Sequence, residues 1–166
     1  MAKRVDPPFQ ADEREMLVSW LEYQRATLAV KCEGLSAEQL RTAAVPPSTL
    51  SLLGLIRHMA EVERGWFRRT LGAEDAPPIY YSDEDPDGDF DVRAADAAEA
   101  FARWDNECNR ARRIVTDTRS LDVVGRQRLG NEVSLRWILV HMIEEYARHN
   151  GHADFLRERL DGVVGD

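Results

Sequence analysis

The stretch SLLGLIRHMAEVERGWFRRTLG, Ser51 to Gly72, decides the fold. Its apolar residues recur at intervals of three and four, which is the pattern of a helix that buries one face. They are Leu52, Leu55, Ile56, Met59, Val62, Trp66 and Phe67. Ser48 or Thr49 is expected to cap the start of this helix, and Gly72 to end it. The stretch therefore predicts a long amphipathic helix that forms part of the core.

Three more stretches have the same spacing, so three further long helices are expected. Their ranges are 11–32, 93–118 and 134 onward. Between them, Ser36 and Gln39 match the capping-box pattern of a short helical turn. No stretch makes a convincing strand, and residues 73–91 are predicted to form one acidic loop. Four long amphipathic helices predict an all-α fold, a four-helix bundle, as a single domain over residues 1–166.

Composition and charge exclude several classes of protein. The chain has 166 residues, 43% of them hydrophobic, which suits one globular domain. Its net charge of −8 argues against binding to nucleic acid or to an anionic membrane surface. No apolar run approaches the roughly 20 residues of a membrane span, and the N-terminus lacks the apolar core of a secretory signal. We therefore expect a cytoplasmic protein, and its excess of arginine over lysine hints at an actinobacterial, GC-rich genome.

The two cysteines and the acidic loop are weak candidates for metal sites. Cys32 and Cys108 form no CxxC pair, so we expect small buried residues and no disulfide or zinc thiolate. In SDEDPDGDFD, residues 82–91, the opening of a calcium-binding EF-hand loop is matched by Asp83, Asp85, Asp87 and Gly88. The twelfth position, which should be a bidentate glutamate, is alanine. A solvated acidic loop is therefore predicted there.

Three of the four histidines lie in HMIEEYARHNGH, residues 141–152. In a helix Glu145 and His149 are one turn apart and can reach a single ion. Together with His58 of the 51–72 helix they would form a His2Glu set, which is typical of a catalytic zinc with an open coordination position. The alternative is a polar stripe on the helix surface, with glutamates paired to Arg148.

HMAEVERGW and EEYARHNGH resemble the DinB/YfiT-like superfamily, and most closely its mini-circle-type DinB-like proteins. The resemblance covers nearly the whole chain and implies a four-helix bundle that binds a divalent metal. The implied ligands are His58, Glu145 and His149, with His141 and His152 outside the ligand set. Many relatives have histidine at both last-helix positions. The His-Glu-His set here is similar to that of mycothiol-dependent maleylpyruvate isomerase and related thiol transferases.

Our first hypothesis for the function is a metal-dependent thiol S-transferase, because a metal that coordinates a thiol supplies the thiolate nucleophile at neutral pH. Its cofactor would be a divalent metal, zinc or another ion such as nickel, and its partners a low-molecular-weight thiol such as mycothiol and an electrophile. No catalytic residue is assigned. Arg57, Arg64 and Arg148 are candidates for steering the anionic parts of a substrate.

Two alternative functions remain open at this point. One is a metal-dependent small-molecule hydrolase, in which Glu61, one turn after His58, would serve as the base. The other is a non-catalytic metal-binding or interaction protein, a homodimer formed through a helix face that includes Trp66 or Trp104.

Overall fold

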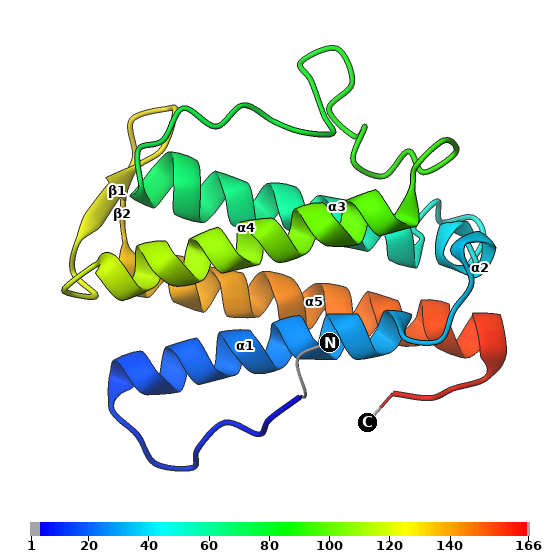
Figure 1. The fold of residues 1–166 in the computed structure, drawn as a ribbon, viewed down its shortest axis with the longest axis horizontal. Coiled ribbons are helices and arrows are strands. Elements are labelled where there is room, and N and C mark those ends of the chain that lie inside the picture. Colours follow the sequence, from blue (N-terminus) through cyan, green and yellow to red (C-terminus); the bar gives the residue numbers. More distant parts are fainter. Residues whose placement is uncertain (1–3, 166) are drawn as a thin grey trace.

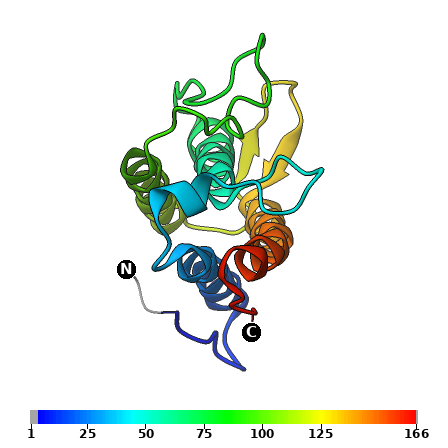
Figure 2. The ribbon, with the colours of Figure 1, turned by 90° about the vertical axis from the view of Figure 1, so that its right-hand side faces the viewer.

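The computed structural model describes residues 4–165, and it is mostly helical. The helices are α1 (Glu13–Cys32), α2 (Ala37–Arg41), α3 (Leu52–Glu63), α4 (Ala97–Asp117) and α5 (Leu135–Asp161), and α3 continues directly into a π-helix, η1 (Arg64–Leu71). The four long helices run side by side, with α1 next to α5 and α3 next to α4 (Figures 1 and 2). In the described part of the chain, no helix is long and apolar enough to cross a membrane.

The helix boundaries follow their capping residues. The capping box at α2 is confirmed, because Ser36 accepts from the backbone N–H of Gln39 and the Gln39 side chain accepts from that of Ser36. The helix in the 51–72 stretch starts later than predicted. Its cap is Ser51, whose hydroxyl accepts from the backbone N–H of Gly54. The start of α4 is also later, because Asp96 caps it by accepting from the backbone N–H of Glu99.

The prediction that the chain contains no strand was wrong. Strands β1 (Val124–Arg126) and β2 (Glu132–Ser134) form an antiparallel hairpin, in which Gly125 is opposite Val133. A Cβ atom on Gly125 would lie 2.2 Å from the carbonyl oxygen of Thr70. Glycine therefore allows β1 to pack directly on the backbone of η1. Strands of three residues are too short to show alternation of apolar and polar side chains, so periodicity could not reveal them.

A buried polar network lies in the mainly apolar core, between α1, α3, α4 and α5. Glu63 is fully buried, and its carboxylate accepts two hydrogen bonds from the Arg25 guanidinium at 2.7 and 2.6 Å. The Tyr146 hydroxyl donates to the same carboxylate at 2.8 Å and accepts from the Trp104 indole N–H. Because a buried charge is costly unless it is paired and hydrogen-bonded, this network holds the long helices in one relative arrangement.

The segment between η1 and α4 lies along α3, where it crosses the upper side of the molecule in Figure 1. Side chains on one face of α3 and η1 bind its backbone at successive helical turns. Arg57 binds the carbonyls of Gly88 and Asp91, Glu61 accepts from the N–H groups of Ile79 and Tyr80, and Arg64 binds the carbonyl of Pro77. The predicted acidic loop is therefore fixed to the helix that carries His58.

Candidate metal centre and adjoining cleft

The structure brings His58 of α3 together with Glu145 and His149 of α5. Each offers one ligand atom, and the three atoms lie within 4.8 Å of one another. His149 Nε2 is 3.5 Å from a Glu145 carboxylate oxygen, and the rings of His58 and His149 are 4.8 Å apart between centroids. The three side chains are 22%, 13% and 10% exposed, in chain order, so they are shielded from bulk water but still reachable. This donor set and spacing suit a divalent cation such as zinc.

His58 and His149 each use one ring nitrogen in a hydrogen bond and leave the other for a ligand. His58 Nδ1 lies 2.8 Å from Asp89 Oδ2, and a carboxylate at this place accepts the Nδ1 proton. His149 Nδ1 lies 3.3 Å from His152 Nδ1, so one of the two donates to the other. A histidine that binds a metal usually has its second nitrogen in such a bond. His152, which the sequence analysis placed outside the ligand set, contacts a candidate ligand directly.

The His149 imidazole is held in the neutral form that a metal ligand requires. Burial lowers the pKa of His149 to about 4, and the nearby His58, His152 and Arg148 contribute to the decrease. A neutral imidazole keeps a lone pair on a ring nitrogen, whereas an imidazolium has none to donate. At neutral pH His149 is therefore neutral and can donate a ring-nitrogen lone pair to a metal.

A second group lies one turn earlier on α5. Atoms of His141, Glu144 and Glu145 also lie within 4.8 Å of one another. The His141 ring is stacked on Trp137, with ring centroids 4.9 Å apart, and meets the Trp66 ring edge-on. The guanidinium of Arg148 binds both glutamates of this group. The alternative prediction of glutamates paired with Arg148 is thus correct for this turn, while Glu145 also takes part in the His58 group.

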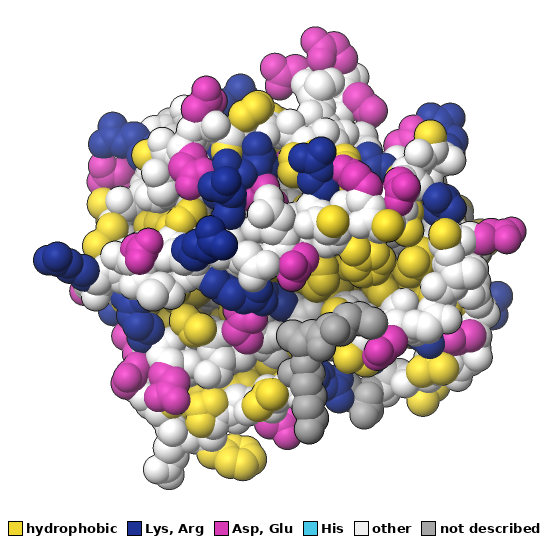
Figure 3. Space-filling model, viewed as in Figure 1, with side chains coloured by type: hydrophobic (Ala, Val, Ile, Leu, Met, Phe, Trp, Pro, Cys, Tyr) yellow, Lys and Arg dark blue, Asp and Glu magenta, His cyan; other side chains and the backbone are white. Residues whose placement is uncertain are grey.

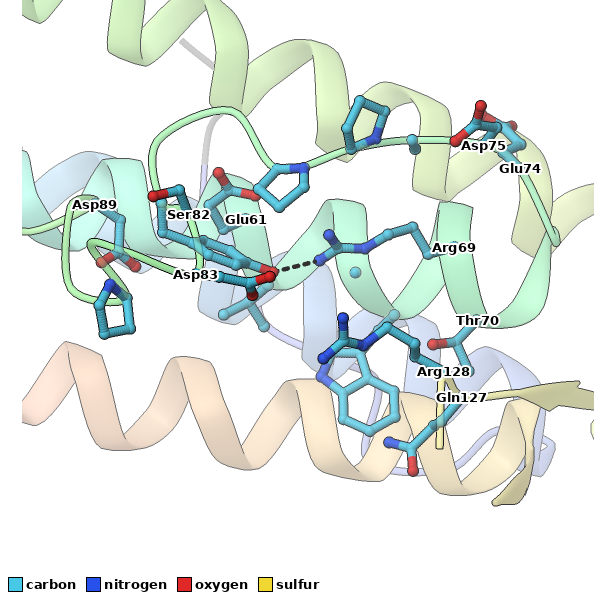
Figure 4. A pocket seen from close by; sticks show the side chains of 18 of the residues that line it. Glu61, Arg69, Thr70, Glu74, Asp75, Ser82, Asp83, Asp89, Gln127 and Arg128 are labelled. Atoms are coloured by element: carbon cyan, nitrogen blue, oxygen red, sulfur yellow. Dashed lines mark hydrogen bonds between the residues drawn. The ribbon is translucent and has the colours of Figure 1, made fainter. Parts of the chain in front are cut away.

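A cleft of about 1220 Å³ adjoins the candidate metal centre. It reaches from His58 and Asp89 along η1 to the loop that joins β1 and β2 (Figure 4). Its walls are formed by the η1 residues Gly65, Trp66, Arg69 and Thr70, by loop residues 74–78, 81–84, 86 and 89, and by hairpin residues 126–129. In Figure 3, no histidine side chain is visible on the part of the face over α4 and α1 that the grey atoms leave uncovered.

The π-helix and the hairpin shape the far end of this cleft. In η1 the residues at four-residue spacing, Gly65 with Arg69 and Trp66 with Thr70, line the same wall. Short π-helical segments inside helices occur frequently at functional sites. A Cβ on Gly65 would lie 2.9 Å from a guanidinium nitrogen of Arg69. Because glycine has no side chain, the Arg69 guanidinium can lie against the backbone at Gly65.

The arginines that line the cleft differ from those proposed from sequence. Arg57 and Arg64 are bound to loop carbonyls, and Arg148 is bound to the glutamates of α5. The cleft instead contains Arg69, which donates to the hydroxyl of Tyr81 (dashed in Figure 4), and Arg128 of the hairpin loop. Both were missed because the apolar spacing of the 51–72 stretch does not distinguish a π-helix from an α-helix, and the strands of the hairpin are too short to show alternation.

Glu61, the candidate base of a hydrolase, is 4% exposed, and its carboxylate binds the backbone of the loop. One of its oxygens accepts from the backbone N–H groups of Ile79 and Tyr80 at 2.5 and 2.6 Å. Burial raises the pKa of the Glu61 carboxyl, and these two donors oppose the increase. Glu61 therefore fixes the loop backbone to α3.

The acidic loop is solvated as predicted, with one exception. Asp83, Asp85 and Asp87 are exposed, but Asp89 is 5% exposed and faces His58. The sequence has no signal that separates Asp89 from its acidic neighbours, because a loop has no periodicity that assigns a face. The residue that contacts a candidate ligand was therefore overlooked.

Both cysteines are buried free thiols, as predicted. Burial raises the pKa of Cys32 to about 12, and burial also raises that of Cys108. A thiol acts as a nucleophile or as a metal ligand in its thiolate form. Neither cysteine therefore competes with the histidine cluster as a reactive centre.

The helices and the cluster define a class of protein: helical proteins with a candidate His2Glu centre between two helices, beside a cleft of ligand size. The family model described as mycothiol-S-transferase matches residues 16–162. The chain belongs to the mycothiol-S-transferase family, a DinB/YfiT-like family. No curated protein matches the chain.

Proposed function

We propose that the protein is a metal-dependent thiol S-transferase that uses mycothiol. The observation that carries the proposal is the convergence of His58, Glu145 and His149 beside a cleft, in a chain of the mycothiol-S-transferase family. We infer further that residues 1–166 are one domain with the DinB/YfiT-like four-helix bundle fold. The four long helices lie side by side, and the family match over residues 16–162 reaches into each of them. Both observations support this inference.

His58, Glu145 and His149 would hold the metal, which is zinc in our proposal. When bound there, a divalent cation lowers the pKa of a coordinating thiol and so supplies a thiolate at neutral pH. The chain's own residues set the conditions for this step. As ligands, His58 and His149 would be neutral donors and Glu145 would contribute one negative charge, so that the site with a divalent cation would have a net charge of about +1 and would attract a thiolate.

The cleft residues hold the electrophile near the sulfur. In the transfer, a sulfur electron pair forms the S–C bond, the leaving group departs with the electrons of its own bond to carbon, and the thiol proton passes to water. Trp66 presents an aromatic face, and Arg69 and Arg128 present donors to polar groups of the substrate. The long loop, bound along α3, covers one side of the cleft and limits the access of water.

The test is consumption of mycothiol with monobromobimane as the electrophile, a probe that forms a fluorescent thioether and releases bromide. We expect zinc-loaded protein to accelerate the reaction, and Glu145→Ala and His149→Ala to reduce it to the uncatalysed rate. Glu158→Gln, on the exposed side of α5, is the matched control and keeps the wild-type rate. Equal rates in wild type and His149→Ala would overturn the proposal.

A further inference from the structure

Asp89 is placed to orient a metal ligand. Its Oδ2 lies 2.8 Å from His58 Nδ1, and its side chain is 7% exposed. With Nδ1 engaged as a donor to the carboxylate, the lone pair of His58 is on Nε2. The tautomer is therefore set by a residue that lies 31 positions later in the sequence.

The ring of His58 is also held through one of its faces. Phe90, the neighbour of Asp89, stacks on His58 with centroids 4.9 Å apart and an angle of 23° between the planes. Gly54, one turn before His58, makes room for this ring, because a Cβ there would lie 3.3 Å from Phe90 Cδ1. Two consecutive loop residues thus determine both the proton position and the orientation of the imidazole.

Arg57 fixes the loop on both sides of Asp89. Its guanidinium donates to the carbonyl oxygen of Gly88 at 2.9 Å and to that of Asp91. It also lies over the ring of Tyr80, at 4.3 Å from the ring centroid. A planar guanidinium can bind two acceptors at once, which the single ammonium of lysine cannot do in the same geometry. Arg57 and His58 are adjacent in sequence. One turn of α3 therefore carries both the candidate ligand His58 and the arginine that binds the loop around Asp89.

We propose that Asp89 is a positioning residue of the metal centre, and that Arg57 acts on the centre through Asp89. This inference rests on the metal site of the proposed function. A carboxylate that accepts the second N–H of a ligating histidine increases the basicity of the ligand and restricts its rotation. Loss of such a partner typically reduces metal affinity by about 10- to 100-fold.

The test is a titration of EDTA-treated protein with Co²⁺, followed by the visible absorption of the bound ion. We expect Asp89→Ala to weaken Co²⁺ binding by about 10- to 100-fold. Asp89→Asn keeps an acceptor for the Nδ1 proton but loses the charge, and its affinity should fall between those of wild type and Asp89→Ala. Asp87→Asn, an exposed aspartate on the same loop, is the matched control and should bind as wild type does.

Two further measurements separate positioning from a merely structural role. Urea unfolding of the metal-free variants reports stability, which a structural role would lower without a change in the Co²⁺ affinity of the folded protein. Arg57→Ala should weaken Co²⁺ binding, and Arg57→Lys should restore it only in part. If Arg57 acts through Asp89, the double variant Arg57→Ala/Asp89→Ala binds no more weakly than Asp89→Ala alone.

The outcomes distinguish this inference from the proposed function. Co²⁺ affinity of Asp89→Ala within twofold of the wild-type value would overturn the role of Asp89 and leave the metal centre intact. Additive losses in the double variant would overturn the action of Arg57 through Asp89. Failure of the wild-type protein to bind Co²⁺ would overturn the metal centre itself.

Discussion

The packing of strand β1 on η1, which forms the far end of the cleft, can be tested by adding one methyl group at Gly125. In Gly125→Ala the new Cβ would lie 2.2 Å from the Thr70 carbonyl oxygen and 2.7 Å from Leu71 Cα. Both are backbone atoms of η1, so no side-chain rotation can relieve the contact. The strand β1 must withdraw from η1, by roughly 1 Å or more, and overpacking of this kind costs about 1–3 kcal/mol.

The assay for Gly125→Ala is equilibrium unfolding in urea, with Gly151→Ala as the matched control. Gly151 is exposed in the interior of α5, and a Cβ there has no atom within 4 Å. Because glycine is unfavourable inside a helix, Gly151→Ala should stabilise the protein by about 0.5–1 kcal/mol. Identical methyl additions are therefore expected to change the free energy of unfolding in opposite directions.

Gly125→Ala should change the rate of thiol transfer but not the affinity for a metal ion. The hairpin contributes Arg128 to the cleft, so transfer to the electrophile should slow. The candidate ligands lie on α3 and α5, so Co²⁺ affinity should not change. A Gly125→Ala protein as stable as wild type would refute the packing argument.

Three other predictions concern stability. Arg25→Ala leaves the buried Glu63 unpaired, and urea unfolding should show a loss of about 3–5 kcal/mol, whereas a loss under 1 kcal/mol would contradict the network. The pKa of Glu61 is higher in the folded metal-free protein than in the unfolded chain, where it is near 4.5. The free energy of unfolding therefore decreases as the pH rises above 4.5, because the unfolded chain releases the Glu61 proton more readily. Glu61→Gln should remove this decrease, and its stability relative to wild type should increase from pH 4 to pH 7; a constant difference would contradict the pKa shift. Zinc at 100 times its dissociation constant should stabilise wild type by about 2.7 kcal/mol and should leave Glu145→Ala unchanged, as thermal melts in zinc and in EDTA would show.

The long helices and the candidate ligands could be anticipated from sequence because helical spacing assigns a face. Glu145 and His149 are one turn apart on α5, and that spacing alone places their side chains together. Spacing does not say which helices are neighbours. His58 was therefore only a candidate third ligand from the residue pattern, and the resemblance to known proteins favoured it. The structure places the three ligand atoms near one another.

Asp89, Arg69 and Arg128 could not be predicted, because the spacing of apolar residues does not show which way their side chains face. Asp89 is on a loop of exposed acids, and the contacts of Arg57 with the loop carbonyls hold the loop where Asp89 faces His58. Arg128 lies beyond a strand of three residues, and Arg69 in a π-helix that continues an α-helical pattern. Each depends on tertiary contacts between segments far apart in the chain, which local spacing cannot predict.

The most direct test of the central claim is the metal content of tag-free protein, measured by inductively coupled plasma mass spectrometry after reconstitution with zinc and removal of free metal. The site predicts close to one equivalent in wild type and in Glu158→Gln, and little in His149→Ala or Glu145→Ala. Equal zinc in wild type and His149→Ala, or none in either, would contradict a metal centre at His58, Glu145 and His149.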